Sequence, residues 1–131
     1  MRLLTIGKTS AATGCNIETI RFYEKEGLLP EPQRTQGGHR LYTQEQTERL
    51  IFIRRCRELG FSMADIRQLL SLVDGQEVTC ERVKTIVEAH LTQTREKLTA
   101  LRKMERTLFA LSRSCDGGDV PDCPIIEALL N

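Results

Sequence analysis

Two cysteines flank a short loop near the end of the chain, and their spacing suits the binding of one metal ion. Seven residues separate Cys115 from Cys123 in the stretch CDGGDVPDC, so the loop can fold back until both sulfurs meet a single ion. Thiolates are soft ligands, which select Cu(I), Zn(II) and heavier soft ions over magnesium or calcium. The spacing alone also allows a disulfide or a redox-sensing pair of thiols.

The composition of the chain narrows these alternatives. The 131 residues are 40% hydrophobic and 28% charged, which is ordinary for a globular protein. No apolar run approaches the ~18 residues of a membrane helix, and the start lacks the hydrophobic stretch of a signal peptide. We therefore expect a cytoplasmic protein that has no membrane partner. Thiols stay reduced in that compartment, so five cysteines favour metal or redox chemistry over a disulfide framework.

Charge is distributed unevenly along the chain. Residues 1–60 carry ten Lys or Arg and seven Asp or Glu, a net charge of +3, whereas residues 61–131 carry nine and eleven, a net charge of −2. The sign favours an anionic partner for the N-terminal half. No constellation of catalytic residues is visible, so we do not expect an enzyme.

The elements that must position the cysteines are mostly helical. A brief helix is expected over residues 6–13, and Gly37 with Gly38 marks the turn of a small β-wing. Three more helices are expected to begin behind the capping residues Asn16, Thr43 and Ser62. In the last two of these, apolar spacing predicts that the core-facing residues are Leu50, Ile53, Leu59, Ile66, Leu69 and Leu70.

One helix is much longer than the others. Behind the capping residue Thr79, residues 80–113 contain no Pro or Gly, and their apolar positions from Leu91 onward step by nearly heptad intervals. At 1.5 Å per residue this helix is about 50 Å long. A chain of this size cannot cover it, so we expect a homodimer. We divide the chain into a DNA-binding domain (1–72), a dimerisation helix (79–113) and a metal-binding loop with a short helix behind Pro124 (114–131).

The N-terminal half has the pattern of a DNA reader. Two short helices followed by a wing are typical of a winged helix-turn-helix, whose second helix enters the major groove. Arginine suits phosphate or guanine, and a tyrosine hydroxyl suits a phosphate oxygen. The expected contacts to double-stranded DNA come from the exposed face of the second helix and from the wing: Thr19, Arg21, Phe22 and Tyr23, then Arg34, His39 and Arg40.

Four motifs, in order, resemble the MerR family of bacterial transcription regulators: TIRFYE (19–24), GLL before the wing, GGHRLY (37–42) and RELGFS (57–62). The resemblance covers nearly the whole chain. It implies a mainly α fold, with a winged helix-turn-helix followed by a long antiparallel coiled-coil helix in a homodimer. It also implies binding to a promoter whose two elements are spaced too far apart for RNA polymerase. The dimer with its effector bound would bend and untwist the spacer, a deformation on the order of a few kcal/mol.

The resemblance also assigns roles by position. It implies that Arg21, Phe22 and Tyr23 contact DNA from the recognition helix, and that Arg34 and Arg40 contact the backbone from the wing. His39 is a departure, because the family usually has Tyr or Phe there. An imidazole can still donate to a phosphate, with a mild dependence on pH.

The end of the chain resembles the metal-sensing branch of the family. Only 16 residues follow Cys115, too few for an organic-ligand pocket, and the loop is similar to the metal-binding loop of these sensors. In an antiparallel pair, Cys80 of one subunit lies beside Cys115 and Cys123 of the other. The resemblance implies that sensors of divalent ions have Cys at position 80 and that sensors of Cu(I) or Ag(I) have Ser.

Charge explains this difference in ligands. Three thiolates around a divalent ion leave a net charge of −1, whereas three around a monovalent ion would leave −2 in a poorly solvated site, which is costly. We therefore expect Hg(II), Pb(II), Cd(II) or Zn(II) as the effector. Zn(II) would want a fourth ligand, for which the loop offers Asp116, Asp119 and Asp122.

Three alternatives stay open. The seven-residue gap and the DCPII ending resemble copper-sensing members, which favours Cu(I) or Ag(I). A thiol–disulfide redox regulator and a structural zinc site in an interaction protein use the same Cys115 and Cys123. We expect Cys15 and Cys56, far along the chain from the loop, to be small buried hydrophobic residues.

Overall fold

The computed structural model describes residues 2–75, 79–115, 117 and 123–131. The chain divides into two units, Met1–Val83 and Lys84–Asn131. This division lies inside the long helix, whereas the sequence analysis places the first functional boundary at residue 72. The functional boundaries stay predictions, and the two units are described separately below.

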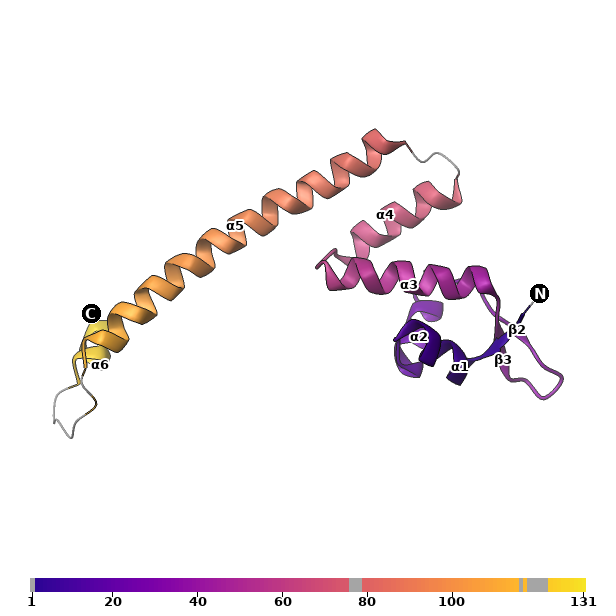
Figure 1. The fold of residues 1–131 in the computed structure, drawn as a ribbon, viewed down its shortest axis with the longest axis horizontal. Coiled ribbons are helices and arrows are strands. Elements are labelled where there is room, and N and C mark those ends of the chain that lie inside the picture. Colours follow the sequence, from indigo (N-terminus) through magenta and orange to yellow (C-terminus); the bar gives the residue numbers. More distant parts are fainter. Residues whose placement is uncertain (1, 76–78, 116, 118–122) are drawn as a thin grey trace. The chain divides into compact units, whose positions relative to one another are not determined.

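Among the described residues, the first unit contains four complete helices (Figure 1). Each begins behind a residue whose side chain caps it. Asn16 Oδ1 accepts from the Thr19 amide at 2.7 Å, which caps the second helix. Thr43 and Gln46 form a complete capping box at the start of the third. These caps confirm the predicted starts, and Ser62 caps the fourth helix in the same way. The helices are α1 (Ile6–Thr13), α2 (Ile17–Lys25), α3 (Gln44–Glu58) and α4 (Met63–Asp74).

A small antiparallel sheet completes the first unit. The wing forms as expected, with the strands β2 (Gln33–Arg34) and β3 (Arg40–Tyr42) on either side of the glycine turn. Gly38 has a φ of 84°, which only glycine adopts readily. The sequence analysis missed β1 (Leu4–Thr5), which pairs with the other edge of β3 and gives the order β1-β3-β2.

The core of the first unit lies between these helices and the sheet. Ile20, Leu50, Ile53 and Ile66 are fully buried there, and Leu69 and Leu70 are buried as predicted. The prediction for Leu59 is wrong, because this side chain is 69% exposed. Helix α3 ends at Glu58, so Leu59 is its C-cap residue, and the turn at Gly60 brings Phe61 into the core instead.

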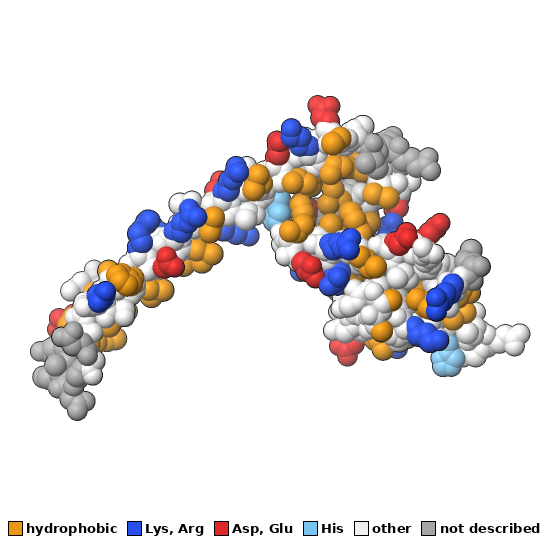
Figure 2. All heavy atoms as spheres, in the orientation of Figure 1, with side chains coloured by type: hydrophobic (Ala, Val, Ile, Leu, Met, Phe, Trp, Pro, Cys, Tyr) orange, Lys and Arg blue, Asp and Glu red, His pale blue; other side chains and the backbone are white. Residues whose placement is uncertain are grey.

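The second unit contains most of α5 (Cys80–Arg113) and all of α6 (Pro124–Leu130), as predicted. In α5 the only buried residue is Ile86. Figure 2 shows hydrophobic side chains along one edge of α5, and those that are exposed include Leu91, Leu98, Leu101, Met104 and Leu108. Within the described part of the chain, no helix is both long and apolar enough to cross a membrane.

Candidate nucleic-acid interface and metal ligands

Helix α2 presents part of the expected DNA-reading surface. Arg21 is exposed, Phe22 is 47% exposed, and Thr19 is half-buried at the start of the helix. A large aromatic ring on the surface of a small unit is available to a partner, so Phe22 does not belong to the core. The placement of these three residues agrees with the expected surface, and their contacts with DNA stay a prediction.

Tyr23 does not lie on that exposed face. Its side chain is only 6% exposed, because Tyr23 comes three residues after the buried Ile20 and shares its inward face. Burial raises the pKa of its phenol. The expectation that the α2 surface offers Tyr23 to DNA is therefore wrong, and its ring supports the neighbouring Phe22, with 5.8 Å between the ring centroids.

Two of the three wing residues that we expect to contact DNA are exposed. Arg34 and His39 are exposed. Arg34 Nη1 donates to the Gly38 carbonyl at 2.8 Å, and the His39 amide donates to Thr35 Oγ1 at 3.1 Å. These bonds stiffen the turn, so the wing tip meets a ligand as a preformed loop rather than as a flexible one.

The third wing residue, Arg40, is already engaged. Its Nε lies 3.0 Å from Glu24 Oε2, and the Tyr42 hydroxyl donates to Glu24 Oε1. The Glu24 side chain is 11% exposed, so a largely buried carboxylate of α2 holds two residues of β3. Burial, and then the hydrogen bond to the Glu24 carboxylate, raise the pKa of Tyr42.

Sequence reasoning missed Glu24 as a functional residue. The available signal was its position four residues after the buried Ile20, on a helix whose surface is otherwise suited to an anion. An acidic residue that turns inward beneath a basic surface has a structural partner. Here Glu24 sets the position of the wing relative to the recognition helix.

A basic cleft lies between α2 and the wing. Its volume is about 520 Å³. Two carboxylates, Glu24 and Glu31, reach the same space, but cations outnumber them. Such a cleft suits an anionic group such as a phosphate. The cationic lining residues are Arg21, Lys25, Arg34 and Arg40.

The three cysteines that the sequence analysis predicts as metal ligands lie at the two ends of α5. Cys80 is the first residue of the helix and is exposed. Cys115 follows its other end, Cys123 precedes α6, and both are half-buried free thiols. A 34-residue helix spans about 50 Å, so one chain cannot bring Cys80 to the other two. Consistently, the described residues hold no cluster of three potential metal ligands.

Helix α6 is placed beside the end of α5. A surface cleft is lined by Arg106, Ala110 and Ser114 from that end and by Pro124 and Ala128 from α6. Cys115 and Cys123 thus belong to one end of the second unit, as a shared site requires. The loop aspartates Asp116, Asp119 and Asp122 lie outside the described residues.

The remaining two cysteines are structural. Cys15 and Cys56 are 4% and 7% exposed, which confirms that they are small buried residues. Burial raises the pKa of the Cys56 thiol, so this group stays protonated and unreactive.

The chain matches two known family models. Residues 4–73 match the family described as "MerR HTH family regulatory protein", and residues 47–111 match "MerR, DNA binding". These two matches together span the first unit and most of α5.

Individual relatives agree with this placement. The chain is 40% identical to the mercuric resistance operon regulatory protein of Bacillus cereus, over 95% of this chain and 96% of the relative. It is 39% identical to the transcriptional regulator ZntR of Escherichia coli K12, over 95% and 90%. A crystal structure of the regulator PbrR691 from Ralstonia metallidurans CH34 in complex with lead(II) matches with a TM-score of 0.83 and 45% identity, over 96% and 98%. The chain therefore belongs to the MerR family of transcription regulators.

Proposed function

We propose that this protein is a transcriptional regulator that responds to a soft divalent metal ion, binds promoter DNA as a homodimer and activates metal-resistance or efflux genes. The family consists of regulators rather than enzymes, and relatives are named for mercuric resistance or bind lead(II). The observation that carries the proposal is the position of Cys80 at the opposite end of α5 from Cys115 and Cys123.

The exposed apolar edge of α5 supports a dimer. Leu101, Met104 and Leu108 are 59%, 58% and 65% exposed, which is unfavourable in water unless another surface covers them. A second copy of α5 offers a matching seam. In an antiparallel pair, the start of one α5 lies beside the end of the other, so Cys80 of one subunit meets Cys115 and Cys123 of its partner.

The proposed site suits a divalent ion with few ligands. A complex of three thiolates with Hg(II), Pb(II) or Cd(II) has a net charge of −1. The N-terminus of α5 favours the thiolate form of Cys80. Zn(II) prefers four ligands, so its binding would require one more, for which a loop aspartate is the candidate. Cu(I) remains the second candidate effector, because the seven-residue gap between Cys115 and Cys123 resembles copper-sensing members.

DNA recognition follows from the two exposed elements of the first unit. The α2 residues Arg21 and Phe22 are suited to the major groove, and the wing residues Arg34 and His39 to the phosphate backbone. Metal binding changes the geometry at the start of α5, which repositions the two DNA-binding units. The dimer then distorts the spacer of the promoter, and RNA polymerase reads the result through the DNA.

The first test is an anaerobic titration of the reduced protein with Hg(II), Pb(II), Cd(II), Zn(II) and Cu(I). Thiolate-to-metal charge-transfer absorption reports the binding of each ion. Cys80→Ser should weaken divalent binding strongly, whereas Cys15→Ala, which removes a buried thiol outside the site, should leave it unchanged. If Cu(I) binds best and Cys80→Ser has no effect, the protein is a copper sensor. If oxidants change transcription without any metal, it is a thiol–disulfide regulator.

A mixing experiment tests whether the site is shared between subunits. Cys80→Ser and the double variant Cys115→Ser/Cys123→Ser should each lose tight binding as homodimers. In the mixed dimer, one site regains all three cysteines and the other has none. We expect tight binding to return at one ion per mixed dimer. No recovery on mixing would show that the ligands come from a single chain.

A further inference from the structure

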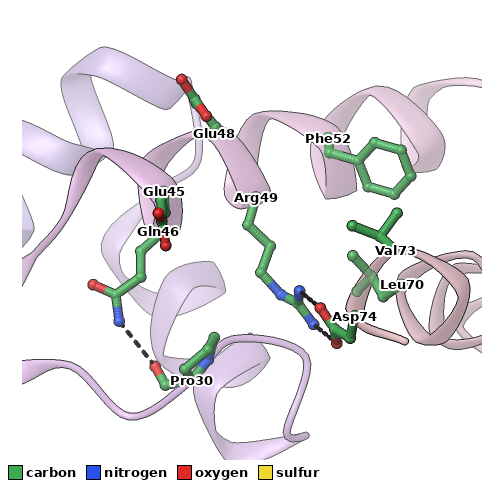
Figure 3. A pocket seen from close by; sticks show the side chains of 9 residues that line it. All are labelled: Pro30, Glu45, Gln46, Glu48, Arg49, Phe52, Leu70, Val73 and Asp74. Atoms are coloured by element: carbon green, nitrogen blue, oxygen red, sulfur yellow. Dashed lines mark hydrogen bonds and ion pairs between the residues drawn. The ribbon is translucent and has the colours of Figure 1, made fainter. Parts of the chain in front are cut away.

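Arg49 joins the end of α4 to the segment that follows the recognition helix. Arg49 Nε donates to the Leu28 carbonyl at 2.6 Å. Its two terminal nitrogens reach the Asp74 carboxylate, Nη1 to Oδ1 at 2.7 Å and Nη2 to Oδ2 at 3.0 Å (Figure 3). This planar, bidentate arrangement is specific to arginine. The Arg49 side chain is 18% exposed and the Asp74 side chain is 57% exposed, so the pair lies at the surface with its arginine the more buried partner.

A second contact ties α4 to the same segment. Arg67 Nη2 donates to the Glu26 carboxylate at 2.8 Å and to the Glu26 carbonyl at 3.2 Å. Helix α2 ends at Lys25, so Glu26 and Leu28 are the first and third residues beyond it. Both contacts therefore connect α4 to the C-terminal end of the recognition helix. The contact through Arg49 lies at the last residue of α4.

The last turn of α4 borders an open space. A cavity of about 440 Å³ lies beside it, and Figure 3 shows Phe52, Leu70 and Val73 at its wall beside the Arg49–Asp74 pair. Leu70 is the last buried residue of α4, whereas Val73 is 50% exposed. Leu72 is half-buried in this turn, and the bidentate ion pair adds a polar contact at its last residue.

The ion pair is also close in sequence to a proposed metal ligand. Asp74 ends α4, Gly75 caps the helix with its amide bonded to the Ser71 carbonyl at 2.9 Å, and Cys80 begins α5. A separation of six residues spans at most about 20 Å, so Asp74 and Cys80 lie within that distance of each other. Both Asp74 and Cys80 belong to the first unit.

We propose that the Arg49–Asp74 pair is the positioning contact through which the metal state at Cys80 sets the recognition helix. The inference rests on the proposed function, because it assumes that metal binding moves the start of α5. When the pair is intact, a movement of the end of α4 displaces Arg49. Arg49 in turn displaces Leu28, whose carbonyl it binds in the segment that follows α2. When the pair is broken, the last turn of α4 moves into the cavity by itself and α2 keeps its position in both metal states.

The test compares metal-dependent transcription at saturating promoter occupancy among variants of the pair and a control that changes the charge as Asp74→Asn does. Asp74→Asn and Arg49→Lys remove the bidentate pair, and Asp74→Glu keeps a carboxylate. Glu58→Gln is the control, because it breaks an ion pair of similar length within α3, Arg54 Nη1 to Glu58 Oε1 at 2.8 Å. We expect Asp74→Asn and Arg49→Lys to lower the induction ratio by about tenfold, the size of a typical coupling between sites. Asp74→Glu should recover part of the ratio, and the control should keep it.

Measuring metal affinity and promoter affinity distinguishes a positioning role of the Arg49–Asp74 pair from a merely structural one. Both affinities should stay near those of the unaltered protein in Asp74→Asn, since neither set of contacting residues is changed. Full induction in Asp74→Asn, or a loss of folding in both pair-breaking variants, overturns the inference. If the unaltered protein responds to no metal, the proposed function fails as well. If it responds and Asp74→Asn responds equally, only the positioning role fails.

Discussion

The two units of this protein differ in how much of their stability they can supply themselves. Residues 2–75 enclose a core in which the side chains of Ile20, Leu50, Ile53 and Ile66 are fully buried, whereas α5 buries only Ile86 and α6 buries none. The first unit can therefore hold its DNA-reading residues in place by its own packing. The second unit presents an apolar seam and incomplete sets of ligands. In the proposed function, metal sensing therefore depends on a partner chain, whereas the first unit packs its own core.

The largest expected effect is on the seam. Replacing Leu101 and Leu108 with Asp removes apolar burial of about 1.5–3 kcal/mol per leucine in each chain. We expect the dimer dissociation constant to rise at least ~1,000-fold, as measured by sedimentation velocity. The control is Thr99→Asp/Lys103→Asp on the opposite, polar face of α5, which should remain dimeric. A dimer that survives the leucine changes would mean that α5 does not form the interface.

The next largest effect compares a buried and an exposed residue toward the C-terminal end of α3. Ile53→Ala removes a fully buried side chain and should lower the free energy of unfolding of the first unit by about 2–5 kcal/mol. Leu59→Ala, at a position 69% exposed, should change it by less than about 0.5 kcal/mol. Urea unfolding followed by circular dichroism measures both. Equal losses would contradict the assignment of Leu59 to the surface.

A smaller effect tests whether the first unit positions its own wing. Glu24→Ala leaves Arg40 and the Tyr42 hydroxyl without their shared partner, at a cost of about 1–3 kcal/mol. Promoter affinity should fall about tenfold, and hydroxyl-radical footprints should lose protection on the flanks that the wing contacts. Glu31→Ala, at an exposed carboxylate of the same cleft, should not weaken binding. Uniform loss of the whole footprint in Glu24→Ala would argue against a wing-specific role.

The smallest effect appears only at alkaline pH. The pKa of Tyr42 is raised in the folded state above its ordinary value of 10.0, by burial first and then by its bond to Glu24. The unfolded tyrosine loses its proton near pH 10 and the folded one does not, so the stability that this group contributes is present below pH 10 and falls above it. Unfolding in urea between pH 8 and 11 should show a steeper loss for the unaltered protein than for Tyr42→Phe. Parallel pH curves would contradict this.

Local patterns in the sequence were sufficient for most of the elements. Asn16, Thr43 and Ser62 cap helices because a side-chain oxygen satisfies an amide within three residues, an interaction that needs no distant partner. The wing turn likewise follows from its two glycines. The strand β1 was missed because two residues, Leu4 and Thr5, become a strand only by pairing with Leu41 and Tyr42 far along the chain.

The four motifs were enough to identify the family, and the residue types were enough to propose Cys80, Cys115 and Cys123 as soft ligands at the two ends of one uninterrupted helix. The direction in which individual side chains of the first unit face could be read only from the folded chain. Tyr23 turns into the core, Leu59 turns out of it, and Arg40 is held by Glu24. The physical reason is that ligand identity and helix length are local properties. Burial and ion pairing depend instead on which distant elements meet, as when Arg49 joins Leu28 to Asp74.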